Sequence, residues 1–74
     1  MEARKRVGVN IQRLRRAAEL SQEELGARAD VHRTYLSQLE GGKRNPSIDV
    51  LERIAKAMKV DIAEFFQRTG RASR

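Results

Sequence analysis

The chain has 74 residues, of which 39% are hydrophobic and 35% are charged, with a net charge of +6 and no cysteine. This length allows one domain, and the lack of cysteine excludes a disulfide framework and a thiolate metal site. No apolar run approaches the ~20 residues of a membrane-spanning helix, and no apolar core follows the basic start, so we expect a cytoplasmic protein without a secretory signal. The positive charge favours an anionic partner, of which nucleic acid is the commonest.

The first predicted helix covers about Arg4–Glu19. Its apolar side chains recur at i, i+4, i+7 and i+11, which is one stripe of an amphipathic helix. The stripe consists of Val7, Ile11, Leu14 and Ala18. We expect residues 1–6 to fray, because no apolar side chain anchors them.

A helix, a sharp turn and a second helix are predicted next in the chain. Ser21 and Glu24 have the spacing of a capping box, in which each side chain accepts a hydrogen bond from the other residue's amide. The first of these two helices should therefore begin at about Gln22. Its apolar face consists of Leu25 and Ala29.

The turn is expected at residues 30–31, and the second helix should run from about His32 to Glu40. Leu36 and Leu39 supply its apolar face. Gly41-Gly42 should end it, because glycine accepts the left-handed conformation common at helix C-termini. Helix, tight turn and helix form the unit that places a helix in the major groove of DNA.

Two further helices are predicted after this motif. Pro46 lacks an amide donor and stops the preceding helix, whereas Ser47 is a natural N-cap for a fourth helix. Asp61 should cap a short fifth helix, and residues 69–74 should be disordered. The fourth helix has a core-facing stripe of Leu51, Ile54, Ala55 and Met58, and the fifth has an apolar edge of Ile62, Phe65 and Phe66.

The runs SQEEL at 21–25 and VHRTYLSQLEGGKRNPS at 31–47 resemble the helix-turn-helix family of phage repressor, Cro and XRE-type regulators. They are similar in particular to the small controller proteins of restriction-modification systems. The resemblance covers roughly residues 7–66. It implies a single all-α, five-helix, lambda-repressor-like domain that binds double-stranded DNA through its helix-turn-helix.

The outward face of the second motif helix is the candidate reading surface. If its leucines face the core, four polar side chains share the opposite face. Arginine can donate twice to guanine and glutamine can pair bidentately with adenine, although an ordinary polar surface is the alternative. The resemblance implies that these residues contact base edges. They are Arg33, Thr34, Ser37 and Gln38, with His32 at the helix start as a further candidate.

Phosphate contacts are expected at the N-terminus of the first motif helix and in the loop after the second. The candidates are Gln22, Lys43, Arg44 and Asn45. Tyr35 has two open roles, since its hydroxyl can meet a phosphate or its ring can fill the rim of the core. The resemblance also implies a partly buried ion pair between Arg15 and Glu40, for which two unrelated surface charges are the alternative.

The last two helices carry more apolar side chains than so small a core can hold, which predicts a twofold-symmetric homodimer. The interface candidates are Val50, Ala57, Ile62, Phe65 and Phe66. Two copies would read half-sites of a palindromic operator about 34 Å apart. The favoured function is a nucleoid-associated transcriptional regulator of the restriction-modification controller type. A prophage regulator, the antitoxin of a toxin–antitoxin pair, and a protein-interaction module that does not read DNA are the alternatives.

Catalysis is not expected from this sequence. The single histidine, His32, lies far in sequence from any plausible nucleophile and carboxylate, and the carboxylates fall on separate helix faces. Gly41-Gly42 lacks the preceding strand and the directly following helix of a phosphate-binding loop. We therefore expect no catalytic residue, no metal, no cofactor and no small-molecule ligand.

Overall fold

A computed structural model describes residues 2–68 of the chain. In order, its elements are α1 (Ala3–Ala17), α2 (Gln22–Ala29), α3 (Arg33–Glu40), α4 (Ile48–Met58) and the 3₁₀ helix η1 (Ile62–Phe66). The predicted all-α class is confirmed, and the short fifth helix that we predicted is a 3₁₀ helix of five residues, so the described residues contain four α-helices. Such short pieces favour 3₁₀ geometry, and here the Asp61 carboxylate accepts from the amide of Ala63. The disorder expected for residues 69–74 concerns a segment outside the described residues.

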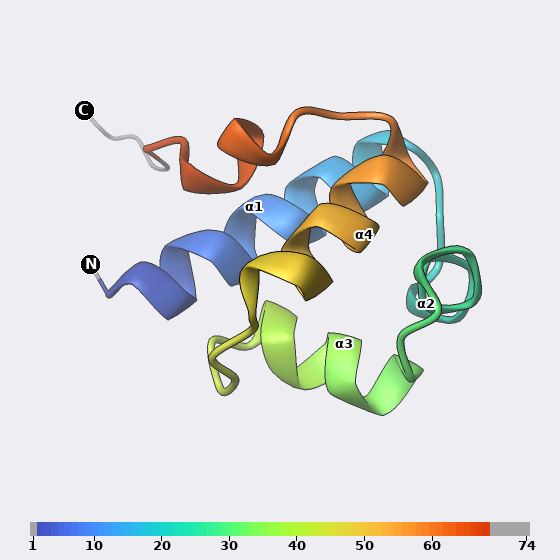
Figure 1. Ribbon diagram of the computed structural model, residues 1–74, viewed down its shortest axis with the longest axis horizontal. Coiled ribbons are helices and arrows are strands. Elements are labelled where there is room, and N and C mark those ends of the chain that lie inside the picture. The colour runs from blue at the N-terminus through green and yellow to red at the C-terminus, as the bar shows by residue number, and fades with distance from the viewer. Residues whose placement is uncertain (1, 69–74) are drawn as a thin grey trace.

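The two helices of the helix-turn-helix, α2 and α3, pack against different neighbours. α1 packs against α3 and η1, whereas α2 packs against α3 and α4. Figure 1 shows α3 along one edge of the molecule and η1 at the opposite edge, with α1 and α4 between them. The outward side of α3 is therefore left uncovered by the other helices.

One hydrophobic core joins all five elements. Leu25, Leu36 and Leu39 of the helix-turn-helix are fully buried and meet Ile11 of α1 and the stripe of α4. The predicted stripe of α4 is buried throughout. In α1 the stripe ends earlier than expected, because Ala18 follows the last helical residue and is exposed.

The helix ends have the predicted chemistry at both sides of α2. The Ser21 hydroxyl accepts from the Glu24 amide at 2.9 Å, and the Glu24 carboxylate accepts from the Ser21 amide at 2.8 Å. The hydrogen bond from the Ser21 amide to the Glu24 carboxylate is the main cause that lowers the pKa of Glu24, and the nearby Ser21 hydroxyl lowers it further. Asp30 then takes a left-handed conformation with φ of 58°, so the chain turns sharply where the sequence predicted.

Two glycines allow α1 to approach the end of α3 closely. A Cβ atom on Gly8 would lie 2.4 Å from the Leu39 carbonyl oxygen, so only glycine fits there. Gly42 has a φ of 75°, and a Cβ on it would lie 3.2 Å from the Cα of Lys5. Residues 3–6, which we expected to fray, are helical in α1, and their backbone adjoins the loop after α3.

Asn10 is a fully buried polar residue that the apolar stripes did not indicate. Its amide nitrogen lies 3.0 Å from the carbonyl oxygen of Phe65 and 2.8 Å from that of Gln67, and its side-chain oxygen accepts from Arg13. Buried carbonyl groups need such donors. Asn10 thus ties the C-terminal segment to α1.

Candidate nucleic-acid interface

α3 separates its apolar and polar side chains onto two faces, as the sequence predicted. Leu36 and Leu39 are fully buried, whereas Arg33, Thr34 and Ser37 are exposed. Gln38, on the same outward side, is half-buried. Three of the candidate reading residues are therefore free to meet a partner without disturbing the core.

His32 precedes α3 as its N-cap, so the helix begins at Arg33 and not at His32. The Nδ1 atom of His32 accepts a hydrogen bond from the Thr34 amide at 3.1 Å. Because Nδ1 is the acceptor in this bond, the proton of the neutral ring is on Nε2. The exposed ring can offer only that Nε2–H to another molecule.

An open groove of about 620 Å³ runs between the N-terminus of α2 and the outward face of α3. Within residues 2–68, the backbone amides of Gln22 and Glu23 at this helix end have no hydrogen-bond acceptor. Free amides at a helix N-terminus attract anions. The groove is lined by Arg15, Ser21, Gln22, Glu23, Arg33, Thr34, Ser37 and Gln38.

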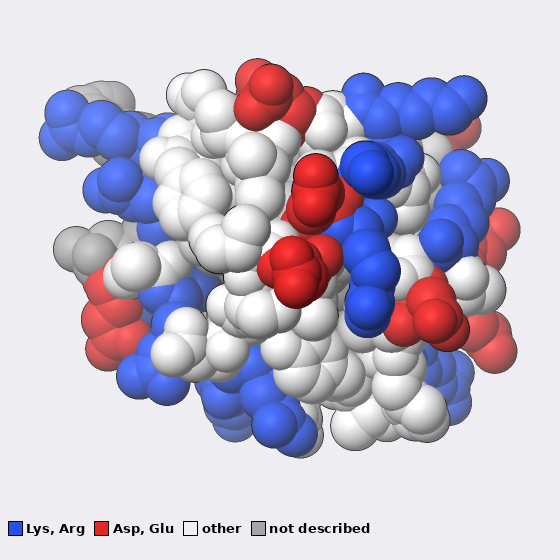
Figure 2. Space-filling view, viewed as in Figure 1, with Lys and Arg blue, Asp and Glu red and all other residues white. Residues whose placement is uncertain are grey.

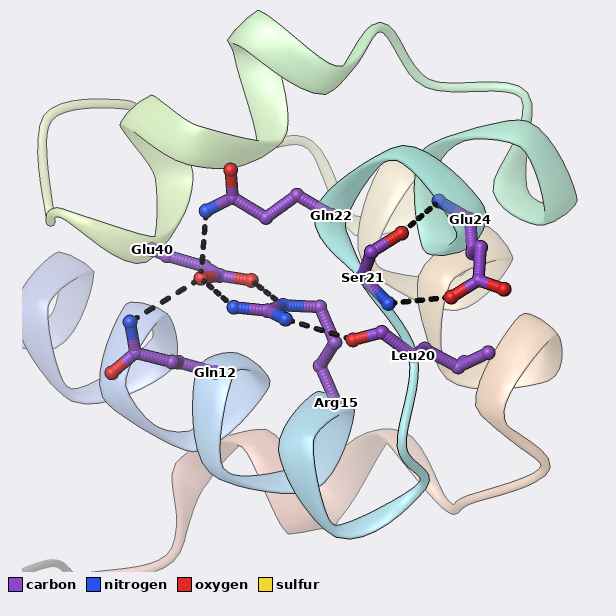
Figure 3. Close-up of polar contacts among 7 residues, drawn as sticks. All are labelled: Gln12, Arg15, Leu20, Ser21, Gln22, Glu24 and Glu40. Carbon is purple, nitrogen blue, oxygen red and sulfur yellow. Dashed lines mark hydrogen bonds and ion pairs between the residues drawn. The ribbon is translucent and has the colours of Figure 1, made fainter.

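The groove rests on an ion pair between Arg15 and Glu40 (Figure 3). Arg15 Nε lies 2.7 Å from Glu40 Oε2, and Arg15 Nη2 lies 3.0 Å from Oε1. Arg15 Nη1 also donates to the Leu20 carbonyl oxygen at 2.8 Å. The side chains are only 10% and 2% exposed, and hydrogen bonding to Glu40 raises the pKa of Arg15. The pair thus joins α1, the α1–α2 linker and the end of α3.

Gln22 connects this ion pair to the groove. Its Nε2 atom donates to Glu40 Oε1 at 3.1 Å, and the side chain is half-buried. A primary amide carries two N–H groups, so one remains after this bond is made. Gln12 of α1 makes a longer contact of 3.5 Å to the same carboxylate oxygen.

The loop after α3 contains the other candidate phosphate contacts. Lys43, Arg44 and Asn45 are all exposed. Arg44, however, folds back over α3: its Nε donates to Gln38 Oε1 at 2.7 Å, and its guanidinium carbon lies 5.2 Å from the centre of the Tyr35 ring. Tyr35 is half-buried and packs against the core, which both of its predicted roles allow.

Sequence reasoning overlooked the basic start of α1 as part of this surface. Lys5 is exposed, and its backbone lies beside Gly42, directly before Lys43. The signal was present in the sequence, since six of the first 20 residues are basic. Only the packing of α1 against the end of α3 places Lys5 at this surface.

A separate apolar patch lies on α4 and η1. Phe66 is 44% exposed, and Ile48, which is not among the predicted interface residues, is 66% exposed. Phe65 is wrong as an interface candidate, because it is fully buried in the core of its own chain. Figure 2 shows an uncharged area over η1 and the start of α4, bordered on one side by acidic side chains. The remaining candidates, Val50, Ala57 and Ile62, are half-buried.

The part of the chain that the structure describes contains no cluster of histidine, aspartate and glutamate that could hold a metal ion. None of its helices has the length and apolar character needed to cross a membrane. The polar side chains of the groove are instead hydrogen-bonding groups of the kinds that contact base edges and phosphates.

Comparison with known proteins agrees with this geometry. Residues 11–65 match the helix-turn-helix family HTH_3. The chain is 45% identical over 69 residues to an HTH-type transcriptional regulator, y4dJ, of Sinorhizobium fredii, covering 93% of this chain and 90% of that protein. It is 40% identical over 62 residues to the control protein C.MunI of a Mycoplasma species, covering 82% and 84%.

Among solved structures, the restriction-modification controller protein C.AhdI from Aeromonas hydrophila superimposes with a TM-score of 0.82. It shares 32% sequence identity, over 84% of this chain and 94% of that one. The family match covers most of the chain, and these likenesses extend over nearly the full length of the relatives. The chain therefore belongs to the helix-turn-helix family of DNA-binding transcriptional regulators.

Proposed function

We propose that this protein binds a palindromic operator as a homodimer and controls the genes of a restriction-modification system. The observation that carries the proposal is the groove in which the outward face of α3 meets the N-terminus of α2. The relatives of the chain include proteins named as restriction-modification controllers. The domain acts by occupying its site, and its own concentration sets the occupancy.

In this proposal the outward face of α3 reads base edges. Arg33 can donate two hydrogen bonds to guanine, and the hydroxyls of Thr34 and Ser37 can pair with several bases. All three are exposed and line the groove. The Nε2–H of His32 adds a donor at the start of the helix.

Phosphate contacts hold the protein in register. The free amides of Gln22 and Glu23 and the second N–H of Gln22 can meet one phosphate at the start of α2. The exposed Lys43 and Asn45, together with Lys5 beside the same loop, suit a second one. The carboxylate of Glu23 opposes this attraction locally, so most of the affinity should come from the loop and from the start of α1.

The dimer is proposed to form through the apolar patch on α4 and η1. Within residues 2–68, Ile48 and Phe66 are the large hydrophobic side chains left exposed, and they border a groove with Val7, Pro46 and Leu51. This patch shares no residue with the reading groove, although Asn45, a candidate phosphate contact, also lines it. A second copy can therefore cover it while both reading faces stay open, as a twofold operator requires.

Selection of bound sequences from a random DNA pool tests the proposal. We expect a palindrome with half-sites one helical turn apart, and a dimer in sedimentation at tens of micromolar protein. Enrichment of no sequence would overturn DNA reading, whereas a monomer with and without DNA would overturn the dimer. An operator that lies upstream of the protein's own gene and an endonuclease gene would support the controller role, and a site only among phage or toxin genes would contradict it.

Two alanine variants distinguish residues that contact base edges from residues that contact phosphates. Arg33→Ala should weaken operator binding by about 5- to 150-fold and binding to scrambled DNA very little, because a bidentate base contact is lost. Lys43→Ala should weaken both by similar factors and lower the salt slope by about one. A salt titration on both DNAs measures this. Equal losses on both DNAs for Arg33→Ala would show that Arg33 contacts the backbone.

A further inference from the structure

Gln38, Tyr35 and Arg44 form a cluster at the C-terminal end of the reading face. The Arg44 Nε–H donates to Gln38 Oε1 at 2.7 Å, and the guanidinium lies over the Tyr35 ring. The backbone reinforces this arrangement, because the Lys43 amide donates to the Gln38 carbonyl oxygen at 2.9 Å. The loop is thus tied to residue 38 through both its side chain and its main chain.

The bond to Arg44 fixes which end of the Gln38 amide faces outward. A guanidinium has N–H donors and no acceptor, so the amide can meet it only with its oxygen. Within the described residues, Gln38 Nε2 has no protein acceptor. The side chain is half-buried, which limits the alternative orientations open to it. Gln38 therefore presents an NH₂ group to the groove and keeps its oxygen turned away.

This orientation changes the base that Gln38 is suited to read. A free glutamine pairs bidentately with adenine by accepting from N6 and donating to N7. Arg44 occupies one lone pair of the Gln38 oxygen and turns that oxygen toward the loop, so the group that Gln38 offers to the groove is its NH₂ donor. The remaining N–H groups of Arg44 are donors too. Guanine offers two acceptors in the major groove, N7 and O6, whereas adenine would place its N6 donor against this set of donors.

We propose that Arg44 is a positioning residue that determines specificity, making Gln38 select guanine in place of adenine at one base pair of each half-site. The inference rests on the proposed function, since it assumes that α3 reads DNA. It gives Arg44 a role beyond the phosphate contact that the sequence suggested. The Tyr35 ring contributes by packing against the Arg44 guanidinium.

The test compares Arg44→Met with Lys43→Met, which removes the same charge from the neighbouring residue but leaves the bond to Gln38 in place. Sequences are selected from a random pool with the full-length wild type and both variants, and Gln38→Ala identifies the base pair that depends on Gln38. At that position we expect about a tenfold preference of the wild type for guanine over adenine, a size that a bidentate contact allows. Arg44→Met should lose or reverse the preference, and Lys43→Met should keep it while losing overall affinity.

Three results would overturn the inference. The first is a wild-type preference for adenine at the position that depends on Gln38. The second is an Arg44→Met variant with the wild-type base profile and only a uniform loss of affinity. The third is an Arg44 Nε–H in the free protein whose NMR signal is unchanged by Gln38→Ala. A wild type that enriches no sequence at all would instead refute the proposed function itself, together with this inference.

Discussion

Breaking the ion pair beneath the reading groove should destabilise the domain more from the arginine side than from the glutamate side. Arg15→Ala leaves the Glu40 carboxylate, 2% exposed, with only the amides of Gln22 and Gln12 as partners. Glu40→Ala leaves a long guanidinium that keeps its bond to Leu20 and can extend toward solvent.

The size of the effect follows from burial. Removing one partner of a buried pair costs about 3–5 kcal/mol, whereas an exposed pair contributes about 0–1 kcal/mol. With part of the hydrogen bonding retained on each side, we expect about 3–4 kcal/mol for Arg15→Ala, within the range for buried pairs. We expect about 2–3 kcal/mol for Glu40→Ala, between the ranges for exposed and buried pairs. The double variant should lose less than the sum, with a coupling of about 2 kcal/mol.

Urea unfolding followed by circular dichroism measures these values for the wild type, both single variants and the double variant. All samples need one protein concentration, because dimerisation would add to the apparent stability. Arg16→Ala is the matched control, since Arg16 is exposed on the same helix. A coupling within about 0.5 kcal/mol of zero would show that the two charges act independently and would refute the reasoning.

Three further variants test other contacts. Asn10→Ala should cost about 1–3 kcal/mol in thermal unfolding because it leaves the carbonyl oxygens of the C-terminal segment unpaired, and an unchanged midpoint would contradict its anchoring role. The lowered pKa of Glu24 adds stability that is fully present above the ordinary glutamate pKa of about 4.3 and is lost as pH falls through the lowered value. Glu24→Gln should therefore flatten the loss of stability on acidification, measured as unfolding midpoint against pH, and an unchanged profile would disprove the link. Lys59→Gly should raise stability by up to about 1 kcal/mol by relieving a left-handed backbone with φ of 59°, whereas a lower stability would mean that glycine entropy outweighs this relief.

The sequence predicted the helices well because each has a local signal. The capping box at Ser21 and the apolar stripe of α4 depend only on residues within a few positions of one another, and both are present in the structure. Such local signals cannot tell which of two neighbouring apolar side chains is buried, because contacts with distant parts of the chain decide this. Phe65 and Phe66 are adjacent and equally apolar, yet only Phe65 reaches the core.

Long-range polar contacts were beyond the local patterns. Arg15 and Glu40 are 25 positions apart, and the resemblance to a family, not their spacing, suggested that they pair. Asn10 reads as an ordinary polar residue, since its carbonyl partners lie 55 and 57 positions further along the chain. The bond between Gln38 and Arg44 spans a turn whose path depends on Gly42, so the sequence suggested two separate contacts where the structure has one cluster.

The division of α3 into two faces has a consequence for how such a regulator evolves. Arg33, Thr34 and Ser37 are exposed, so replacing them should change stability by no more than about 0.5 kcal/mol. A lineage can therefore alter these three codons and pass through variants that all fold. The buried leucines of the same eight-residue helix are under a different constraint, because they hold the fold whatever DNA is read. Operator preference can diverge between descendants while their architecture stays the same, and a new regulatory circuit can begin from a copied gene and very few mutations.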